Sequence, residues 1–266
     1  MTDAFELLAP AVDIARRAGA EIMAVYNDDP AGAVTLKADN SPLTEADTRS
    51  NRYIMQALSN LTPIIPIVSE ESLDEAPDRL QARELWMVDP LDGTKDFLKR
   101  NDEFTVNIAL IREGKPVLGV VYAPALDLLY WGAEGHGAWK QEHGKRPARI
   151  EAGEHDGLPV ITVSRSHLDE ATQAWLDAFG PHELLPAGSS LKFCYVAEGR
   201  ADVYPRLGPI MEWDIAAADA VLRAAGAQIV QQSDGKEPVY NKADLHQPTF
   251  VAYAPGHQKV AAPAKR

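Results

Sequence analysis

One acidic segment of this sequence has the residue types and the spacing of a metal site. An apolar run ends at Asp89, Pro90 fixes a turn, and Asp92 stands three residues after Asp89. The two carboxylates and the carbonyl of Leu91 between them can converge on one point. Oxygen ligands of this kind suit Mg²⁺, which prefers a few carboxylates together with waters and phosphate oxygens. The segment therefore predicts a magnesium site.

The two residues that follow could hold an anion beside that metal. Gly93 lets the backbone approach closely, and Thr94 begins a short predicted helix. The free N–H groups and the positive dipole end of such a helix would face an anion bound to the same metal ions. A metal site next to a phosphate site is the arrangement used in phosphoryl transfer.

Each acidic residue also has an ordinary structural interpretation. An Asp-Pro turn followed by Asp-Gly is common in loops, and the pair Glu70 and Glu71 is typical of a solvated turn. Asp214 could cap a helix, and Asp47 could be the N3 carboxylate of a capping box that begins at Thr44. Together, however, these residues stand at strand ends and helix starts, where α/β folds place their sites. The combination favours a functional cluster.

The elements expected in the first half would deliver these residues to one place. Apolar residues at helical spacing predict a helix over residues 5–26, and the capping box at Thr44 predicts a second that ends near residue 61. Strands over 64–69 and 85–89 would each carry acidic residues at their C-terminal ends. The strand meander that follows is predicted over residues 104–111, 116–122 and 128–131.

The second half has a different rhythm. Residues 141–157 are rich in charge, His and Gly and are predicted to be a loop between the halves. Strand and helix patterns then alternate, which predicts an α/β arrangement. The expected strands are 160–164, 201–204 and 227–230, and the expected helices are 170–179, 191–198 and 215–225.

Composition limits the possible functions. The 266 residues include 39 acidic and 26 basic side chains, for a net charge of −13, and such a field repels nucleic-acid polymers. It does not exclude a small anionic substrate if metal ions and a few cations reverse the local sign. The single cysteine, Cys194, allows no intramolecular disulfide and lies in an apolar run, so we expect a buried core residue.

The chain shows neither a basic N-terminal region typical of a secretory signal nor an apolar stretch of the roughly 20 residues that a membrane span requires. We therefore expect no membrane span and a soluble cytoplasmic protein.

Three motifs in order resemble the signature of the inositol monophosphatase superfamily. They are Glu-Glu-Ser at 70–72, Trp-Met-Val-Asp-Pro-Leu-Asp-Gly-Thr at 86–94 and Trp-Asp-Ile-Ala-Ala at 213–217. The similarity extends over nearly the whole chain. It implies a layered αβαβα sandwich of the α/β class. An N-terminal α+β domain over 1–155 would carry most metal ligands, and a C-terminal α/β domain over 156–266 would complete the site.

The resemblance also implies a mechanism. Two or three Mg²⁺ ions would activate a water that attacks the phosphorus directly, without a phosphoenzyme. The implied catalytic residues are Asp47, Glu70 and Thr94, and the implied metal ligands are Glu70, Asp89, Leu91 through its carbonyl, Asp92 and Asp214. The backbone N–H groups of Gly93 and Thr94 would bind the scissile phosphate.

A finer resemblance, carried by residues 93–101, 103–110, 189–194 and 201–206, is to the nucleotidase branch of that superfamily. This branch removes the 3′-phosphate of adenosine 3′,5′-bisphosphate, and the sulfated analogue of that nucleotide is left open as a substrate. The implied substrate contacts are Gly93, Thr94, His167, Ser189, Lys192, Arg206 and Asp214. The ordinary alternative is that Lys192 is a surface residue and that His167 merely begins a helix.

Two other functions are considered. An inositol-1-phosphate phosphatase would use the same metals, and the segments 95–100 and 189–206 favour the nucleotidase over it. A metal-binding regulatory protein that has lost catalysis is disfavoured because all the acidic motif positions are intact. The family resemblance also suggests a homodimer, and relatives suggest peripheral attachment to the cytoplasmic face of the inner membrane, for which no amphipathic basic helix is apparent.

Overall fold

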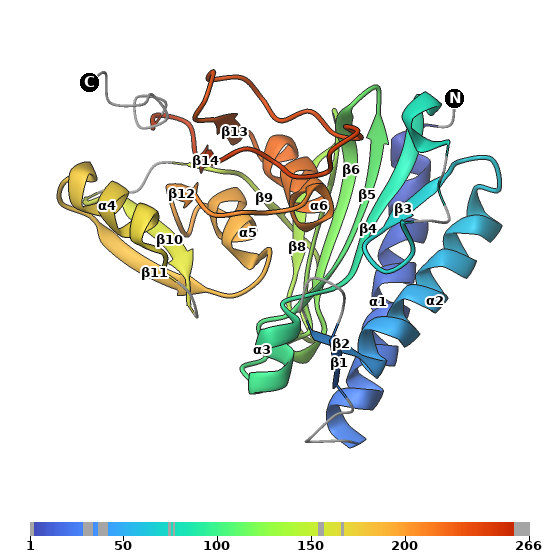
Figure 1. The fold of residues 1–266 in the computed structure, drawn as a ribbon. Helices are drawn as coiled ribbons and strands as arrows, with labels where there is room; N and C mark the ends of the chain where they lie inside the picture. The colour runs from blue at the N-terminus through green and yellow to red at the C-terminus, as the bar shows by residue number, and fades with distance from the viewer. Residues whose placement is uncertain are drawn as a thin grey trace.

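The computed structural model describes residues 3–28, 34–36, 42–73, 76, 78–153, 157–165 and 168–257. Figure 1 shows two main β-sheets with helices between them and on their outer faces. The helices are α1 (Ala4–Asp28), α2 (Glu45–Leu61), α3 (Thr94–Lys99), α4 (Glu170–Phe179), α5 (Leu191–Ala197) and α6 (Glu212–Ala224), with 3₁₀ turns at Arg79–Gln81 and Pro124–Leu126. A short pair, β1 (Val34–Leu36) and β2 (Pro42–Thr44), precedes α2.

The first main sheet has seven strands in the order β3-β4-β5-β6-β7-β8-β9. Its members are β3 (Ile67–Ser69), β4 (Glu84–Asp92), β5 (Thr105–Arg112), β6 (Lys115–Ala123), β7 (Leu128–Ala133), β8 (Gly137–Gln141) and β9 (Ala148–Ile150). The β3–β4 pair is parallel, and the other neighbours are antiparallel. The predicted meander is thereby confirmed as β5, β6 and β7.

The second main sheet has five strands in the order β11-β10-β12-β14-β13. Its members are β10 (Val160–Ser164), β11 (Glu183–Ala187), β12 (Val203–Arg206), β13 (Gln228–Gln231) and β14 (Phe250–Tyr253). Strand β10 runs parallel to β11 and β12, whereas β14 is antiparallel to β12 and β13. The predicted alternation of strands and helices in this half is confirmed.

Three apolar clusters hold these layers together. Helices α1 and α2 bury Ile22 and Ile54 against Trp86 and Ile108 on one face of the first sheet. Helices α5 and α6 fill the space between the two sheets, and the buried Cys194 belongs to this central cluster, as expected. Helix α4 covers the outer face of the second sheet through Leu176. The layers therefore follow the order αβαβα, as the sequence predicted (Figure 1).

Six strands were not predicted, namely β1, β2, β8, β9, β11 and β14, and the expectation of a loop over 141–157 is wrong in part. Strand β9 lies inside that segment and pairs with β8, although charged residues surround its three members. Strand β11 contains Pro186 and exposed side chains because it lies at the sheet edge, where the central-strand pattern is relaxed. Strand β14 is a short buried apolar run without alternation. The division into domains at residues 155 and 156 stays a prediction.

Among the described residues, no helix has both the length and the apolar character needed to span a bilayer.

Helix α6 packs against the first sheet where two glycines leave room for its backbone. A Cβ placed on Gly119 of β6 would lie only 2.0 Å from the carbonyl oxygen of Ala217. A Cβ placed on Gly132 of β7 would lie 2.9 Å from the Cβ of Ala224. Both contacts are far inside van der Waals distance, so any side chain at these positions pushes α6 away from the sheet.

We expect the Gly119→Ala variant to lose about 2 kcal/mol or more of unfolding free energy because overpacking at a backbone contact forces the helix to shift. The measurement is urea unfolding compared with wild type. Gly153→Ala is the matched control, since a Cβ there meets nothing within 4 Å. Equal midpoints for the two variants would show that α6 does not sit on Gly119.

Candidate metal centre

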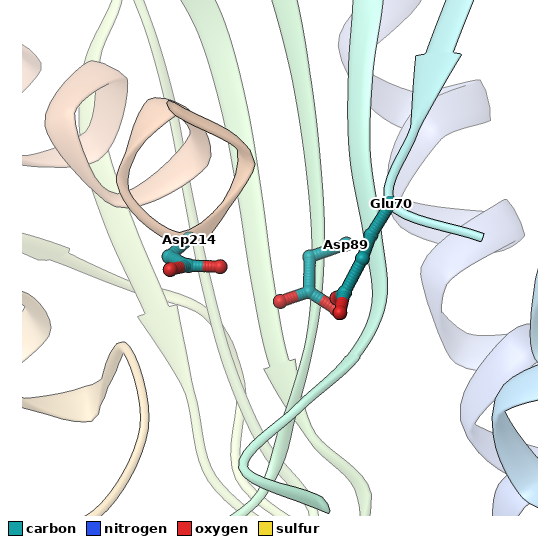
Figure 2. Close-up of side chains that lie close together, drawn as sticks. All are labelled: Glu70, Asp89 and Asp214. Carbon is teal, nitrogen blue, oxygen red and sulfur yellow. The ribbon is translucent and has the colours of Figure 1, made fainter. Parts of the chain in front are cut away.

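Three carboxylates from three different elements meet at one end of the first sheet. The parallel pairing of β3 with β4, in which Ser69 lies opposite Val88, puts Glu70 beside Asp89. Asp214 comes from the first turn of α6, on the other side of the cluster. One carboxylate oxygen of each residue lies within 4.8 Å of the other two. Figure 2 shows the three side chains directed toward one another.

The carboxylates of this cluster repel one another, so the cluster itself does not stabilise the fold. Asp89 is 1% exposed, and burial together with the neighbouring charges of Glu70, Asp92 and Asp214 raises its carboxyl pKa well above the ordinary value. Burial and the charge of Asp92 likewise raise the pKa of Asp214. Buried carboxylates that face one another repel unless a cation lies among them. The oxygen-only ligand set fits a hard divalent ion such as Mg²⁺.

Asp92 and Leu91 lie beside the three-carboxylate cluster. Burial raises the pKa of Asp92, while hydrogen bonds from Ser189 and the charge of Lys192 oppose that rise. The backbone N–H of Leu91 donates to Asp89 Oδ1 at 3.0 Å, which orients the carboxylate. The Leu91 carbonyl accepts a long 3.5 Å contact from the Thr94 hydroxyl. The metal roles predicted for Asp92 and Leu91 stay predictions.

Asp47 and Asp214 each take part in a helix cap and also lie at the site, although the N-cap of α6 is Met211 and not Asp214. Asp47 Oδ2 accepts from the backbone N–H and the hydroxyl of Thr44, at 2.7 and 2.5 Å, so the predicted capping box is confirmed. Its other oxygen, Oδ1, lies 3.3 Å from the Thr94 hydroxyl. Asp214 is the N3 residue of α6 and accepts from the Met211 backbone N–H at 2.9 Å. In both residues the helix cap fixes the carboxylate that faces the site.

A cavity of about 760 Å³ joins the metal cluster to the predicted nucleotide contacts. Among the residues predicted for the site, eight line it: Glu70, Asp92, Gly93, Thr94, Ser189, Lys192, Arg206 and Asp214. Asp89, Leu91 and Asp47 are buried and are not among the residues that line it. His167 lies outside the described residues.

Lys192 is buried, so the alternative that it is a surface residue of its helix is wrong. Its side chain comes from α5, and Nζ donates to the Ser189 carbonyl at 2.5 Å. Burial lowers the pKa of Lys192 to about 8, with Asp92 opposing the shift and Arg206 adding to it. Arg206 donates to the Pro209 carbonyl at 2.6 Å. Two cations therefore face the same cavity.

The sequence predictions missed several polar residues that frame the cavity. Glu103 forms a two-pronged ion pair with Arg165, with distances of 2.7 Å, and accepts from the Gly188 backbone N–H at 2.7 Å. It therefore links the start of β5 to the second sheet. Thr105 Oγ1 lies within hydrogen-bond distance of both Ser189 Oγ and Ser190 Oγ. The available signal was the polar residues inside the run 103–110, an otherwise apolar strand.

Comparison with known proteins agrees with this architecture. Residues 3–264 match the inositol monophosphatase family. The 3′(2′),5′-bisphosphate nucleotidases CysQ of Escherichia coli and Salmonella typhimurium are 49% and 48% identical to this chain over 223 residues, which is 84% of the chain and 89% of each relative.

Solved structures show the same fold. CysQ of Bacteroides thetaiotaomicron superposes with a TM-score of 0.82 at 42% identity, covering 94% of this chain and 97% of that one. The Thermotoga maritima IMPase has a TM-score of 0.79 at 27% identity, covering 96% and 95% of the two chains. The chain therefore belongs to the inositol monophosphatase family, as its motifs predicted.

The raised pKa values predict how metal binding depends on pH. A carboxyl whose pKa is higher in the folded state favours folding below its ordinary value of 3.8, and that contribution is lost as the pH rises through the raised value. The metal-free protein should therefore lose stability across this range. Mg²⁺ binds the deprotonated carboxylates, so the gain in Tm on adding Mg²⁺ should grow with pH.

The measurement is the Tm between pH 5 and pH 8 with excess Mg²⁺ and with EDTA, for wild type and Asp89→Asn. The Asn variant should show a smaller Mg²⁺ gain and a weaker pH dependence, because one of the repelling charges is gone. A Mg²⁺ gain in Asp89→Asn equal to that of wild type would remove Asp89 from the ligand set.

Proposed function

We propose that this protein is a Mg²⁺-dependent phosphomonoesterase that hydrolyses the 3′-phosphate of adenosine 3′,5′-bisphosphate to give AMP and phosphate. The observation that carries the proposal is one cavity lined both by Glu70 and Asp214 of the carboxylate cluster and by two cations, Lys192 and Arg206. A substrate with one phosphate to be cleaved and a second to be held matches these carboxylates and these cations. The CysQ relatives, which bear the name of this nucleotidase, support the same choice.

Two or three Mg²⁺ ions would be held by the predicted metal ligands, which are Glu70, Asp89, Asp92, Asp214 and the Leu91 carbonyl. When bound, the ions supply a nucleophilic water and neutralise the charge of the phosphate and the leaving oxygen. The role of the protein is to position these ligands, and the helix caps and strand pairing described above do so.

Proton handling falls to a pair of residues beside the cluster. The Thr94 hydroxyl lies 3.3 Å from Asp47 Oδ1, so it can donate to that carboxylate while its oxygen accepts a hydrogen bond from a water. Glu70 faces the same space from the opposite side. We assign Thr94 and Glu70 to orienting the attacking water, and Asp47 to holding the Thr94 hydroxyl in its orientation. The N–H groups of Gly93 and Thr94 would bind the scissile phosphate.

Lys192 and Arg206 would bind the 5′-phosphate. Ser189 would lie close to the ribose, and Asp214 would lie near the cleaved bond. Because the pKa of Lys192 is about 8, its ammonium is charged at neutral pH. Arg206 adds a second positive charge in the same cavity. His167, which the nucleotidase branch places near the adenosine, stays a prediction.

We expect Mg²⁺-dependent phosphate release from adenosine 3′,5′-bisphosphate to exceed that from inositol 1-phosphate, because the inositol substrate offers no second phosphate to Lys192 and Arg206. The measurement is phosphate release from both substrates with Mg²⁺ and with EDTA. A preference for inositol 1-phosphate would leave the metal site standing and favour the alternative function. Release that continues unchanged in EDTA would contradict both.

Lys192→Met should raise the KM for adenosine 3′,5′-bisphosphate by about tenfold, the loss expected for one charge-assisted phosphate contact. Hydrolysis of inositol 1-phosphate should change much less. Lys115→Met, at the exposed start of β6, is the control and should behave as wild type. If the variant weakens both substrates equally, Lys192 does not hold the second phosphate.

A further inference from the structure

A chain of four polar side chains connects β5 to the start of α5. Thr105 Oγ1 lies 2.5 Å from Ser189 Oγ and 2.8 Å from Ser190 Oγ. Ser190 Oγ in turn lies 2.8 Å from the side-chain amide of Asn107. Thr105, Asn107 and Ser190 are at most 1% exposed, so water does not compete for these bonds. We call Asn107, Ser190, Thr105 and Ser189 the hydroxyl chain.

The hydroxyl chain ends on a predicted metal ligand. The Ser189 hydroxyl donates to Asp92 Oδ2 and also contacts the Asp92 backbone carbonyl at 3.2 Å. Asp92 comes from the first sheet, whereas Ser189 precedes α5 between the sheets. The position of this carboxylate therefore depends on a hydroxyl supplied by the second half of the chain.

Counting protons fixes the direction of every bond in the hydroxyl chain. An ionised Asp92 only accepts, so the single proton of Ser189 goes to it. Thr105 must then give its own proton to Ser189. Ser190 must give its proton to Thr105, which leaves Ser190 in need of a donor on its other side.

Asn107 can supply that donor if its amide is turned. In the structure Oδ1 faces Ser190, and Nδ2 is buried without a hydrogen-bond partner among the described residues. The nitrogen and oxygen of an amide exchange places on a 180° turn, and the hydrogen-bond network decides between them. Turning the amide makes Nδ2 the donor to Ser190. All four side chains then donate in one direction, toward Asp92.

The same segment also holds the proposed nucleotide-binding lysine. The Ser189 carbonyl accepts from Lys192 Nζ at 2.5 Å, while the Ser189 side chain is bound to Asp92. Ser189 has φ +50°, in the left-handed region that a non-glycine residue adopts only where the surroundings hold it. Its contact with Thr105 is a further hydrogen bond, besides those to Asp92, that ties this strained residue to the first sheet.

We propose that Thr105 is a positioning residue that fixes Ser189 between Asp92 and Lys192 and so couples metal binding to nucleotide binding. The metal and nucleotide roles of Asp92 and Lys192 rest on the proposed function. Thr105 itself touches neither metal nor substrate. Its effect is transmitted through Ser189, whose two ends contact the two parts of the site.

The test uses Thr105→Val, which keeps the shape of the side chain and removes the hydroxyl. Thr162→Val is the matched control, because Thr162 is fully buried and its hydroxyl has no partner among the described residues. Calorimetric titrations with Mg²⁺, and with AMP in the presence and absence of Mg²⁺, give the affinities and their coupling. These measurements do not depend on turnover.

We expect Thr105→Val to bind Mg²⁺ about tenfold more weakly, as for the loss of one hydrogen bond in a chain that ends on a charge. The effect of Mg²⁺ on AMP affinity should shrink with it. Thr105→Ser, which restores the hydroxyl, should recover most of both, and Thr162→Val should match wild type. If Thr105→Val does not fold, Ser190→Ala interrupts the same chain and should show the same weaker Mg²⁺ binding.

Mg²⁺ affinity and coupling in Thr105→Val equal to those of Thr162→Val would overturn the proposal, as would wild-type values in Ser190→Ala. Weaker Mg²⁺ binding that Thr105→Ser does not rescue would also overturn it, since the hydroxyl would not be the cause. The proposed function fails separately, if the wild-type protein with Mg²⁺ releases no phosphate from adenosine 3′,5′-bisphosphate. In that case a loss of Mg²⁺ affinity in Thr105→Val still supports the positioning of Asp92.

Discussion

The repulsion among Glu70, Asp89 and Asp214 is the constraint on which the arrangement of this protein depends. The carboxylates are delivered by two strands and a helix, and one oxygen of each lies within 4.8 Å of the others. Charges brought so close in a largely buried place oppose folding. The three apolar clusters that flank the sheets supply the opposing free energy and hold the backbone in place. The packing of the core therefore assembles the site against this repulsion, which a bound cation would relieve.

Helix α6 links this electrostatic constraint to the packing of the core. Its N-terminal turn carries Asp214, and its length lies against the first sheet at Gly119 and Gly132. A shift of the helix along the sheet would carry Asp214 away from Asp89 by the same distance. Because glycine has no side chain, Gly119 and Gly132 let α6 lie at the position that sets the geometry of the carboxylate cluster. The Asp214 contact with the Met211 backbone N–H then fixes the orientation of the carboxylate itself.

How far the sequence predicts this site depends on how local each feature is. The carboxylates of Asp89 and Asp92 follow from four adjacent residues at a strand end, and the Asp47 capping box likewise follows from four. The burial of Lys192 could not be predicted, because it depends on the second sheet and on Tyr204, whose ring lies 5.6 Å from its Nζ. Thr105 and Asn107 were hidden for a similar reason. They lie in a strand that the pattern predicted correctly, and their partners are 83 to 85 residues away.

Lys192 and Asp92 show that the cations and the carboxylates of the cavity affect one another's pKa values. Burial lowers the pKa of Lys192 and raises the pKa of Asp92, and the charge of each residue opposes the shift in the other. Ser189 lies between them and contacts both, through its carbonyl and its hydroxyl. In a chain with a net charge of −13, a substrate with two phosphate groups approaches against the overall field. The attraction for the substrate must therefore be local. Lys192 supplies part of it, and Ser189 contacts both this cation and the carboxylate of Asp92.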